Sequence, residues 1–104
     1  MLPVHYELDQ TEDFTQWLDG LQKTDRNRLI ARLDRVEQGN FGDHKQLAEN
    51  LFELRCFFGG GLRVYFTIRD AVIVLLLAGG NKDTQKRDIA HANTLLDKLS
   101  PSEH

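Results

Sequence analysis

The sequence has little of what marks a secreted or membrane-embedded protein. Its longest apolar run, Ala71 to Gly80, is about half as long as a membrane-spanning helix requires. The N-terminus carries no basic segment followed by an apolar one, so we expect no secretory signal, no membrane partner and a cytoplasmic location. Cys56 is the single cysteine and lies in an alternating apolar segment, so we expect a reduced thiol in the core.

Common metal and cofactor motifs are also missing. The four histidines show no metal-ligand spacing with one another or with Cys56. The sequence contains no Walker-type glycine loop and no serine, histidine and acid arranged as in a nucleophilic hydrolase. We therefore expect that the protein uses neither a metal nor another cofactor.

Length and charge set broader limits. We expect the 104 residues to form one domain, residues 1–104, around a single core. The formal net charge of −3 argues against a general nucleic-acid coat protein. The charge is uneven along the chain, however, because residues 51–88 hold six basic and four acidic side chains. This excess predicts a modest basic patch on the central segment.

The segment 51–82 predicts three short antiparallel strands joined by two tight turns. Apolar residues alternate with others on both sides of a triple-glycine turn, at Phe52, Leu54, Cys56 and Phe58 and then at Leu62, Val64, Phe66 and Ile68. Glycine tolerates the positive φ angles that such a turn needs. The simplest register pairs Phe58 with Leu62 and therefore sets Arg55 opposite Tyr65.

One face of this hairpin groups Arg55, Arg63 and Tyr65, since directly paired Cβ atoms lie about 5 Å apart. Two guanidinium groups beside a phenol suit a phosphate or a carboxylate. Lys82 adds a cation at the end of the third strand, and Glu53 could orient Arg55 or act as a base. Structural interpretations stay open: an ion pair for Arg55 and Glu53, cross-strand packing for Tyr65, and a loop cation at Lys82.

Three further cations are predicted to contribute to substrate binding. Arg69 ends the second strand of this segment, and Lys86 and Arg87 occupy the first turns of the last helix, close to the mouth of the sheet. The arginines of an earlier helix are interspersed with acids, which indicates a solvated mixed-charge face. We expect these arginines to point outward: Arg26, Arg28, Arg32 and Arg35.

The other elements follow from helical spacing and from capping residues. In order, we expect a strand at 4–8, a helix from a Thr11 cap to Gly20, a helix from a Thr24 or Asp25 cap to Gly39, a loop at 39–50 with a helical turn near Leu47, a third strand of the central segment at 72–78, and a last helix capped by Asp83 or Thr84. This order predicts an α+β domain whose antiparallel sheet packs on an N-terminal helix hairpin, with the C-terminal helix over the other face.

Five segments, in this order and spacing, resemble a known family. They are F-x-x-W-L-x-x-L from Phe14, R-L-x-R-V-E-x-G-N-F-G-D from Arg32, L-F-E-L-R from Leu51, G-L-R-V-Y-F from Gly61 and L-L-A-G-G-N-K-x-x-Q-x-x-D-I-x-x-A from Leu76. Together they span nearly the whole chain. They resemble the phage-derived killer-protein branch of the RelE/ParE toxin superfamily, the HigB-like toxins of type II toxin–antitoxin pairs.

The resemblance implies a RelE/ParE-like fold and a toxin neutralised by a cognate antitoxin, in this branch usually a helix-turn-helix protein. Many superfamily members are metal-independent endoribonucleases that cleave mRNA in the ribosomal A site and so inhibit translation, which would make the ribosome and mRNA partners here. Arg55 and Arg63 would then stabilise the phosphorane charge, Lys82 would add charge or a proton, and Tyr65 would stack on a base or act as a weak acid.

Two other functions stay open at this point, because the fold alone does not choose among them. The ParE branch poisons DNA gyrase, so the protein could be a gyrase inhibitor. It could also be a non-catalytic module that only binds its antitoxin. A homodimer and a toxin–antitoxin heterotetramer are both compatible with the sequence.

Overall fold

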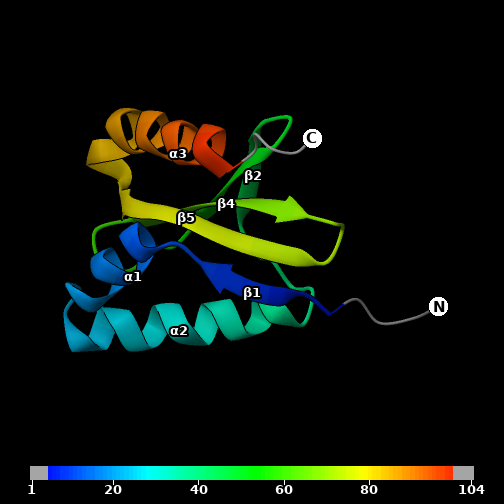
Figure 1. The fold of residues 1–104 in the computed structure, drawn as a ribbon. Coiled ribbons are helices and arrows are strands. Elements are labelled where there is room, and N and C mark those ends of the chain that lie inside the picture. Colours follow the sequence, from blue (N-terminus) through cyan, green and yellow to red (C-terminus); the bar gives the residue numbers. More distant parts are fainter. Residues whose placement is uncertain (1–4, 100–104) are drawn as a thin grey trace.

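The computed structural model describes residues 5–99, in which one twisted sheet lies between two layers of helix (Figure 1). The elements are β1 (Glu7–Gln10), α1 (Glu12–Asp19), α2 (Lys23–Glu37), β2 (His44–Ala48), β3 (Leu51–Arg55), β4 (Leu62–Arg69), β5 (Ile73–Asn81), a 3-10 turn (Lys82–Thr84) and α3 (Gln85–Leu99). The five strands are ordered β1-β5-β4-β3-β2, with β1 parallel to β5 and the other pairs antiparallel. The expected α+β class is confirmed.

Helix α1 begins where the sequence predicted. The Thr11 hydroxyl oxygen accepts the Phe14 N–H at 3.0 Å and donates to the Leu77 carbonyl of β5 at 2.7 Å. This cap therefore satisfies a free N–H of the first turn and also ties α1 to the sheet. Gly20 ends the helix as expected. The strand before it starts later than predicted, at Glu7, and residue 4 lies outside the described residues.

Helix α2 begins earlier than predicted. Its N-cap is Gln22, which is extended and makes no side-chain capping bond, so Thr24 and Asp25 lie inside the first turn. The negative charge of Asp25 still favours that end of the helix dipole. At the other end, Gly39 takes a φ of 91° and its N–H donates to the Val36 carbonyl at 2.8 Å, which confirms the predicted stop.

The loop predicted at 39–50 contains an additional strand. Residues His44–Ala48 form β2, which pairs antiparallel with β3 through His44 and Leu54 and through Lys45 and Glu53. There is no helical turn near Leu47; that side chain packs on the second core cluster. Because β2 is a polar edge strand, its residues lack the alternation that would have indicated a strand.

The β3–β4 register differs by two residues from the prediction. Arg55 lies opposite Arg63, and Glu53 lies opposite Tyr65. The reason is that β3 ends at Arg55, after which residues 56–61 form a wider turn with positive φ at all three glycines. A shift of two residues keeps each side chain on its predicted face, so only the pairing changes.

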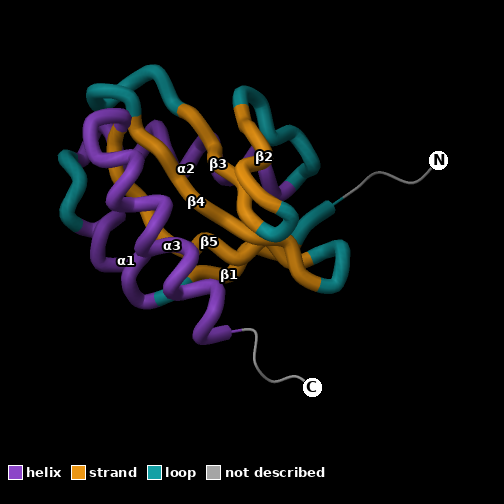
Figure 2. Tube along the Cα trace, turned by 90° about the horizontal axis from the view of Figure 1, so that it is seen from above, coloured by secondary structure: helices purple, strands orange, loops and turns teal. Residues whose placement is uncertain are grey.

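The two faces of the sheet bury separate apolar clusters. Helices α1 and α2 cover one face through Phe14, Leu29 and Val36, which pack with the even-numbered residues of the strands. Helix α3 covers the opposite face, as predicted, and Ala92 lies at the centre of that contact. Figure 2 shows α3 lying over β5 and β4, whereas the outer strands β3 and β2 extend beyond it.

Strand β5 continues past the predicted end at Ala78, and close packing explains why glycines occupy its next two positions. A Cβ on Gly79 would overlap the Trp17 indole, and one on Gly80 would overlap the Asp88 carboxylate. Glycine therefore lets α1 and α3 approach the strand from both sides. Asn81 then caps a 3-10 turn through the Asp83 N–H at 2.9 Å, and α3 begins at Gln85, directly after the predicted cap residues Asp83 and Thr84.

No helix within residues 5–99 has the length and apolar character needed to cross a membrane.

Candidate functional site

Three of the predicted site residues line one hollow at the end of β3 and β4. Arg55 and Arg63 face each other across the strand pair, and Lys82 comes from the turn after β5. The hollow has a volume of about 350 Å³. Its other lining residues are Asp43, Cys56, Phe57, Gly60 and Gly61. The arrangement therefore gathers three cations around an open space, with a single carboxylate in the wall.

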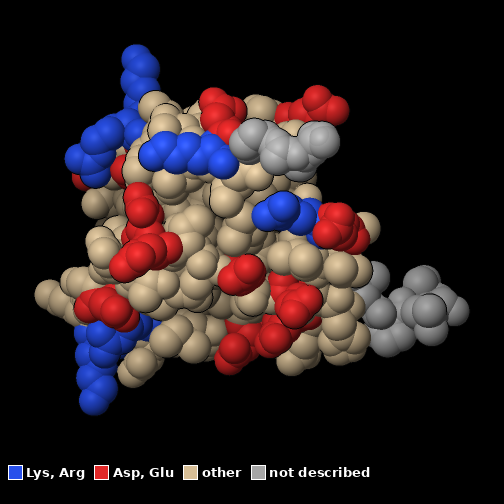
Figure 3. Space-filling view, in the orientation of Figure 1, with Lys and Arg blue, Asp and Glu red and all other residues tan. Residues whose placement is uncertain are grey.

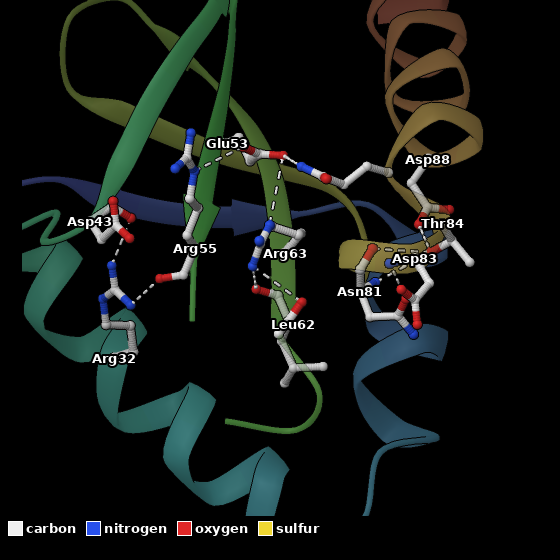
Figure 4. A network of polar contacts seen from close by, with 12 residues as sticks. Arg32, Asp43, Glu53, Arg55, Leu62, Arg63, Asn81, Asp83, Thr84 and Asp88 are labelled. Carbon is white, nitrogen blue, oxygen red and sulfur yellow. Dashed lines mark hydrogen bonds and ion pairs between the residues drawn. The ribbon is translucent and has the colours of Figure 1, made fainter. Parts of the chain in front are cut away.

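The Glu53 carboxylate contacts both arginines and fixes their positions. This side chain is 1% exposed, and its Oε1 accepts from Arg55 Nε at 3.2 Å while its Oε2 accepts from Gln85 Nε2 at 2.7 Å. Arg63 Nε lies 4.0 Å from the same Oε2, and Figure 4 shows the Glu53 carboxylate between the two guanidinium groups. A buried carboxylate needs such partners, because an uncompensated charge in the interior is very costly.

The guanidinium groups keep donors that the protein does not use. Arg63 Nη1 donates to the Gly61 and Leu62 carbonyls, both at 3.2 Å, which fixes the side chain beside the glycine turn. Arg55 is 36% exposed and donates to Glu53 only through Nε. Within residues 5–99, the two terminal nitrogens of Arg55 have no protein acceptor, so an anion in the hollow could accept hydrogen bonds from them.

Tyr65 does not reach this hollow. Its side chain is completely buried and belongs to the cluster under α3, together with Leu75 and Ala92. Burial, and then the negative charge of Glu53, raise the pKa of Tyr65 far above its usual range. The expectation that this phenol faces a substrate is therefore wrong: the register shift sets it beside Glu53, and α3 covers the face from which it projects.

The three predicted substrate-binding cations lie in two separate places, Arg69 in one and both Lys86 and Arg87 in the other. Arg69 lies six residues along β4 from Arg63, which corresponds to roughly 20 Å, and it lines a different hollow beside Leu96 and the end of α3. Lys86 and Arg87 are exposed in the first turn of α3, shortly after Lys82. Arg87 Nε pairs with Asp88 Oδ1 at 3.3 Å.

Arg32 has a structural role that the sequence analysis missed. Rather than pointing outward as predicted, its guanidinium donates to the carbonyls of Arg55 at 2.7 Å, Phe41 at 2.9 Å and Asp43 at 3.0 Å. These bonds fix the end of β3, from which the Arg55 side chain projects (Figure 4). The available signal was its spacing: Arg32 stands three residues after buried Leu29, on the edge of the apolar stripe of α2.

The remaining titratable groups near the hollow give it limited chemistry. Cys56 is buried, which confirms the expected core position. Burial raises the pKa of its thiol, and the nearby charge of Arg32 opposes that rise. Asp43, which the sequence analysis did not single out, is exposed and supplies the carboxylate of the wall. Across residues 5–99, no three side chains of the metal-binding types come together. The site can bind an anion and stabilise developing negative charge.

Comparison with solved structures defines the class of fold. A mutant of the Escherichia coli toxin RelE in the free state superposes with a TM-score of 0.70 at 16% identity, covering 92% of this chain and 99% of that one. The RelE–RelB complex from Pyrococcus horikoshii gives 0.59 at 15% identity, covering 76% and 97%. The protein therefore has the RelE fold, as the RelE/ParE resemblance predicted.

The particular family follows from the sequence match. Residues 16–98 match the family described as Phage derived protein Gp49-like (DUF891), and the chain belongs to that family. A curated relative, an uncharacterized protein of Haemophilus influenzae strain Rd, is 39% identical over 94 residues, which cover 89% of this chain and 95% of the relative.

Proposed function

We propose that this protein is the toxin of a type II toxin–antitoxin pair and that it cleaves mRNA on the ribosome without a metal. The observation that carries the proposal is the group of three cations, Arg55, Arg63 and Lys82, around one open hollow. The RelE fold supports it, because similar solved structures are described as the toxin RelE, and three of the similar structures are complexes of RelE with RelB or a RelB peptide.

The chemistry requires a pentavalent phosphorus with extra negative charge. In metal-free cleavage the 2′-oxygen bonds to phosphorus and the bond to the 5′-oxygen breaks, which leaves a cyclic phosphate and a free 5′-hydroxyl. Arg55 offers its terminal nitrogens to the equatorial oxygens, and Arg63 adds a second fixed cation. Lys82 supplies further charge or the proton that the leaving oxygen takes up.

Among the described residues that line the hollow, none is a strong general base. Asp43 is the one carboxylate in the wall of the hollow, and a carboxylate is a much weaker base than the alkoxide it would have to generate. We propose that the ribosome compensates by holding the mRNA in a reactive geometry. Lys86 and Arg87 are proposed as outer phosphate contacts on the α3 side, and Arg69 is left out because it lies at the far end of β4.

The proposed partner is a cognate antitoxin, a helix-turn-helix protein that places acidic side chains near Arg55 and Arg63. Charge complementarity supports it, since the hollow carries three cations and one carboxylate. Co-purification of the two proteins from their shared operon would test this partnership, and a chain that never co-purifies with the product of a neighbouring gene would contradict it.

Induced expression followed by primer extension on abundant mRNAs tests the nuclease. We expect new 5′ ends within codons, and we expect Arg63→Ala and Arg55→Ala to remove them. The matched control is Arg26→Ala, a partly exposed arginine of α2 whose side chain reaches only the Asp19 carbonyl, at 3.4 Å. Unchanged cleavage by Arg63→Ala would refute the assignment of the site.

One observation favours a second candidate function, a non-catalytic module that binds its antitoxin. Tyr65, the predicted stacking group, is buried away from the hollow. Normal growth and intact mRNA during expression without the antitoxin would support this alternative. A gyrase inhibitor would instead leave mRNA intact while blocking supercoiling by purified gyrase.

A further inference from the structure

Phe57 forms a wall shared by two hollows. It lies in the turn between β3 and β4 and is 88% exposed, more than any other large apolar side chain of residues 5–99. On one side it borders the candidate site. On the other it borders a second hollow of about 390 Å³ against α2, whose remaining lining residues are Arg28, Ala31, Arg32, Arg35 and Phe58.

The two hollows together concentrate positive charge. Six of the 13 basic residues of the chain line them, and only one acid does: Arg28, Arg32, Arg35, Arg55, Arg63 and Lys82, against Asp43. This occurs in a chain whose formal net charge is −3. On the face drawn in Figure 3, many acidic side chains lie over α1, β1 and α2, and further acidic and basic side chains lie around them. The surface formed by the two hollows, which is rich in basic residues, therefore attracts a polyanion.

The exposure of Phe57 is specific to this turn. Its neighbour Phe58 is half-buried, and the Arg28 guanidinium lies over its ring at 5.8 Å from the centroid. Phe57 has no such cover, although it follows directly on buried Cys56. A single exposed apolar residue would need no explanation by itself. An aromatic ring between two basic hollows, however, is the arrangement with which proteins hold single-stranded nucleic acid.

We propose that the surface from the candidate site across Phe57 to α2 binds a segment of single-stranded RNA. One base stacks on Phe57, and the phosphates on either side contact Arg55 and Lys82 in the first hollow and Arg28 and Arg35 in the second. Arg28 and Arg35 stand two helical turns apart on α2, about 10 Å along its axis, so they follow one groove. Arg32 contributes mainly charge, since both of its terminal nitrogens donate to backbone carbonyls.

The RNA in this inference rests on the proposed function, but binding does not require cleavage, so the two are tested separately. The probe is a fluorescein-labelled RNA of about 12 nucleotides with 2′-O-methyl groups, which 2′-hydroxyl attack cannot cleave. Fluorescence anisotropy gives the Kd at several salt concentrations. We expect Phe57→Ala to raise the Kd at least about fivefold, the effect of losing one stacked base.

The charged side of the surface has its own signature. Replacing Arg28 and Arg35 together by alanine removes two phosphate contacts, so the slope of log Kd against log salt should fall by about 1.4. The matched controls are Arg26→Ala and Ile30→Ala, on the same helix but on other faces, and both should leave Kd and slope unchanged. Circular dichroism checks that every variant is folded.

Each outcome decides one claim. If the protein does not bind the probe, or binds it equally well after Phe57→Ala, the inference is overturned, whatever the cleavage assay shows. If Phe57→Ala weakens binding but Arg63→Ala leaves the mRNA ends in cells unchanged, the RNA surface stands and the nuclease proposal fails. If Phe57→Ala impairs only antitoxin binding, the surface belongs to a protein partner and the inference is wrong. Ultraviolet crosslinking in cells then distinguishes ribosomal RNA from mRNA as the bound strand.

Discussion

The most informative single perturbation is the replacement of Glu53 by glutamine. Glu53 is 1% exposed and is the common partner of Arg55 at 3.2 Å, Arg63 at 4.0 Å and Gln85 at 2.7 Å. Glutamine has nearly the same shape but carries no charge, and one of its two terminal atoms becomes a donor. That donor must face either an arginine Nε or the Gln85 amide, and each of these is itself a donor.

The expected loss can be estimated from the exposure of the two arginines. Arg55 is 36% exposed, so water replaces much of what it loses, whereas Arg63 is 15% exposed and its Nε, which has no hydrogen-bond acceptor within the described residues, relies on the ion pair with Glu53 at 4.0 Å. Hydrogen bonds to charged groups contribute about 1.5–3 kcal/mol each, so we expect Glu53→Gln to lower the free energy of unfolding by about 2–3 kcal/mol. Glu53→Ala should cost about 3–5 kcal/mol, because it leaves the charge of Arg63 uncompensated and opens a cavity.

Urea denaturation followed by circular dichroism measures these free energies. The matched control is Glu49→Gln, an exposed carboxylate next to the β2–β3 turn, which should change stability by less than about 0.5 kcal/mol. The Glu53 effect should persist at about 1 M salt, where exposed ion pairs are screened within about 3 Å. A loss below about 1 kcal/mol for Glu53→Gln would refute the reasoning that this carboxylate holds the site together.

Three other predictions concern backbone and burial. Ala71→Gly should raise the free energy of unfolding by about 1 kcal/mol in thermal denaturation, since Ala71 has a φ of 65° in the β4–β5 turn; an unchanged or lowered value would contradict this. Gly80→Ala should lower it by about 3 kcal/mol, because the new Cβ overlaps Asp88. Gly20→Ala, which meets only ordinary contacts, is the control, and equal effects would argue against the close packing of β5. The raised pKa of Tyr65 means that the folded state keeps a proton that the unfolded state loses near its ordinary pKa of about 10. This contribution to stability is therefore complete below that pH and falls above it. Tyr65→Phe should reduce the alkaline fall, to which the raised pKa of Cys56 also contributes, and an identical pH profile would refute the assignment.

The faces of the sheet were predictable because a one-residue slip would expose an entire apolar set. The alternation from Phe52 to Ile68 therefore determined which side chains lie under the helix hairpin and which lie under α3. A two-residue slip preserves every face, so the same alternation carries no information about which residues are opposite each other. That choice depended on the turn, where the hydrogen bond from the Cys56 N–H to the Leu62 carbonyl at 2.9 Å closes a wider loop than three glycines suggested.

The burial of each side chain was less predictable than the face of the sheet from which it projects. Arg55, Tyr65 and Arg63 do project from one face, but α3 covers the end of that face where Tyr65 stands and leaves the end with the arginines open. Period-2 alternation gives a side and says nothing about what lies over it. Strand β2 was missed for a related reason, because an edge strand with one half-buried residue in five has no apolar pattern to read.

The resulting pair of Arg55 and Arg63 is itself informative about function. Like charges directly opposite each other across two strands are destabilising, and a fold selected for stability alone would not place them there. Here the repulsion is offset by a buried carboxylate that contacts both and by the Arg32 guanidinium, which fixes the backbone from which Arg55 projects. Glu53 and Arg32 thus hold two cations at an open surface and leave the terminal nitrogens of Arg55 without a protein acceptor among residues 5–99. Free donors at such a site suit an anionic ligand, and under the proposed function that ligand is the phosphate of an RNA strand, which has the charge and the acceptor geometry for it.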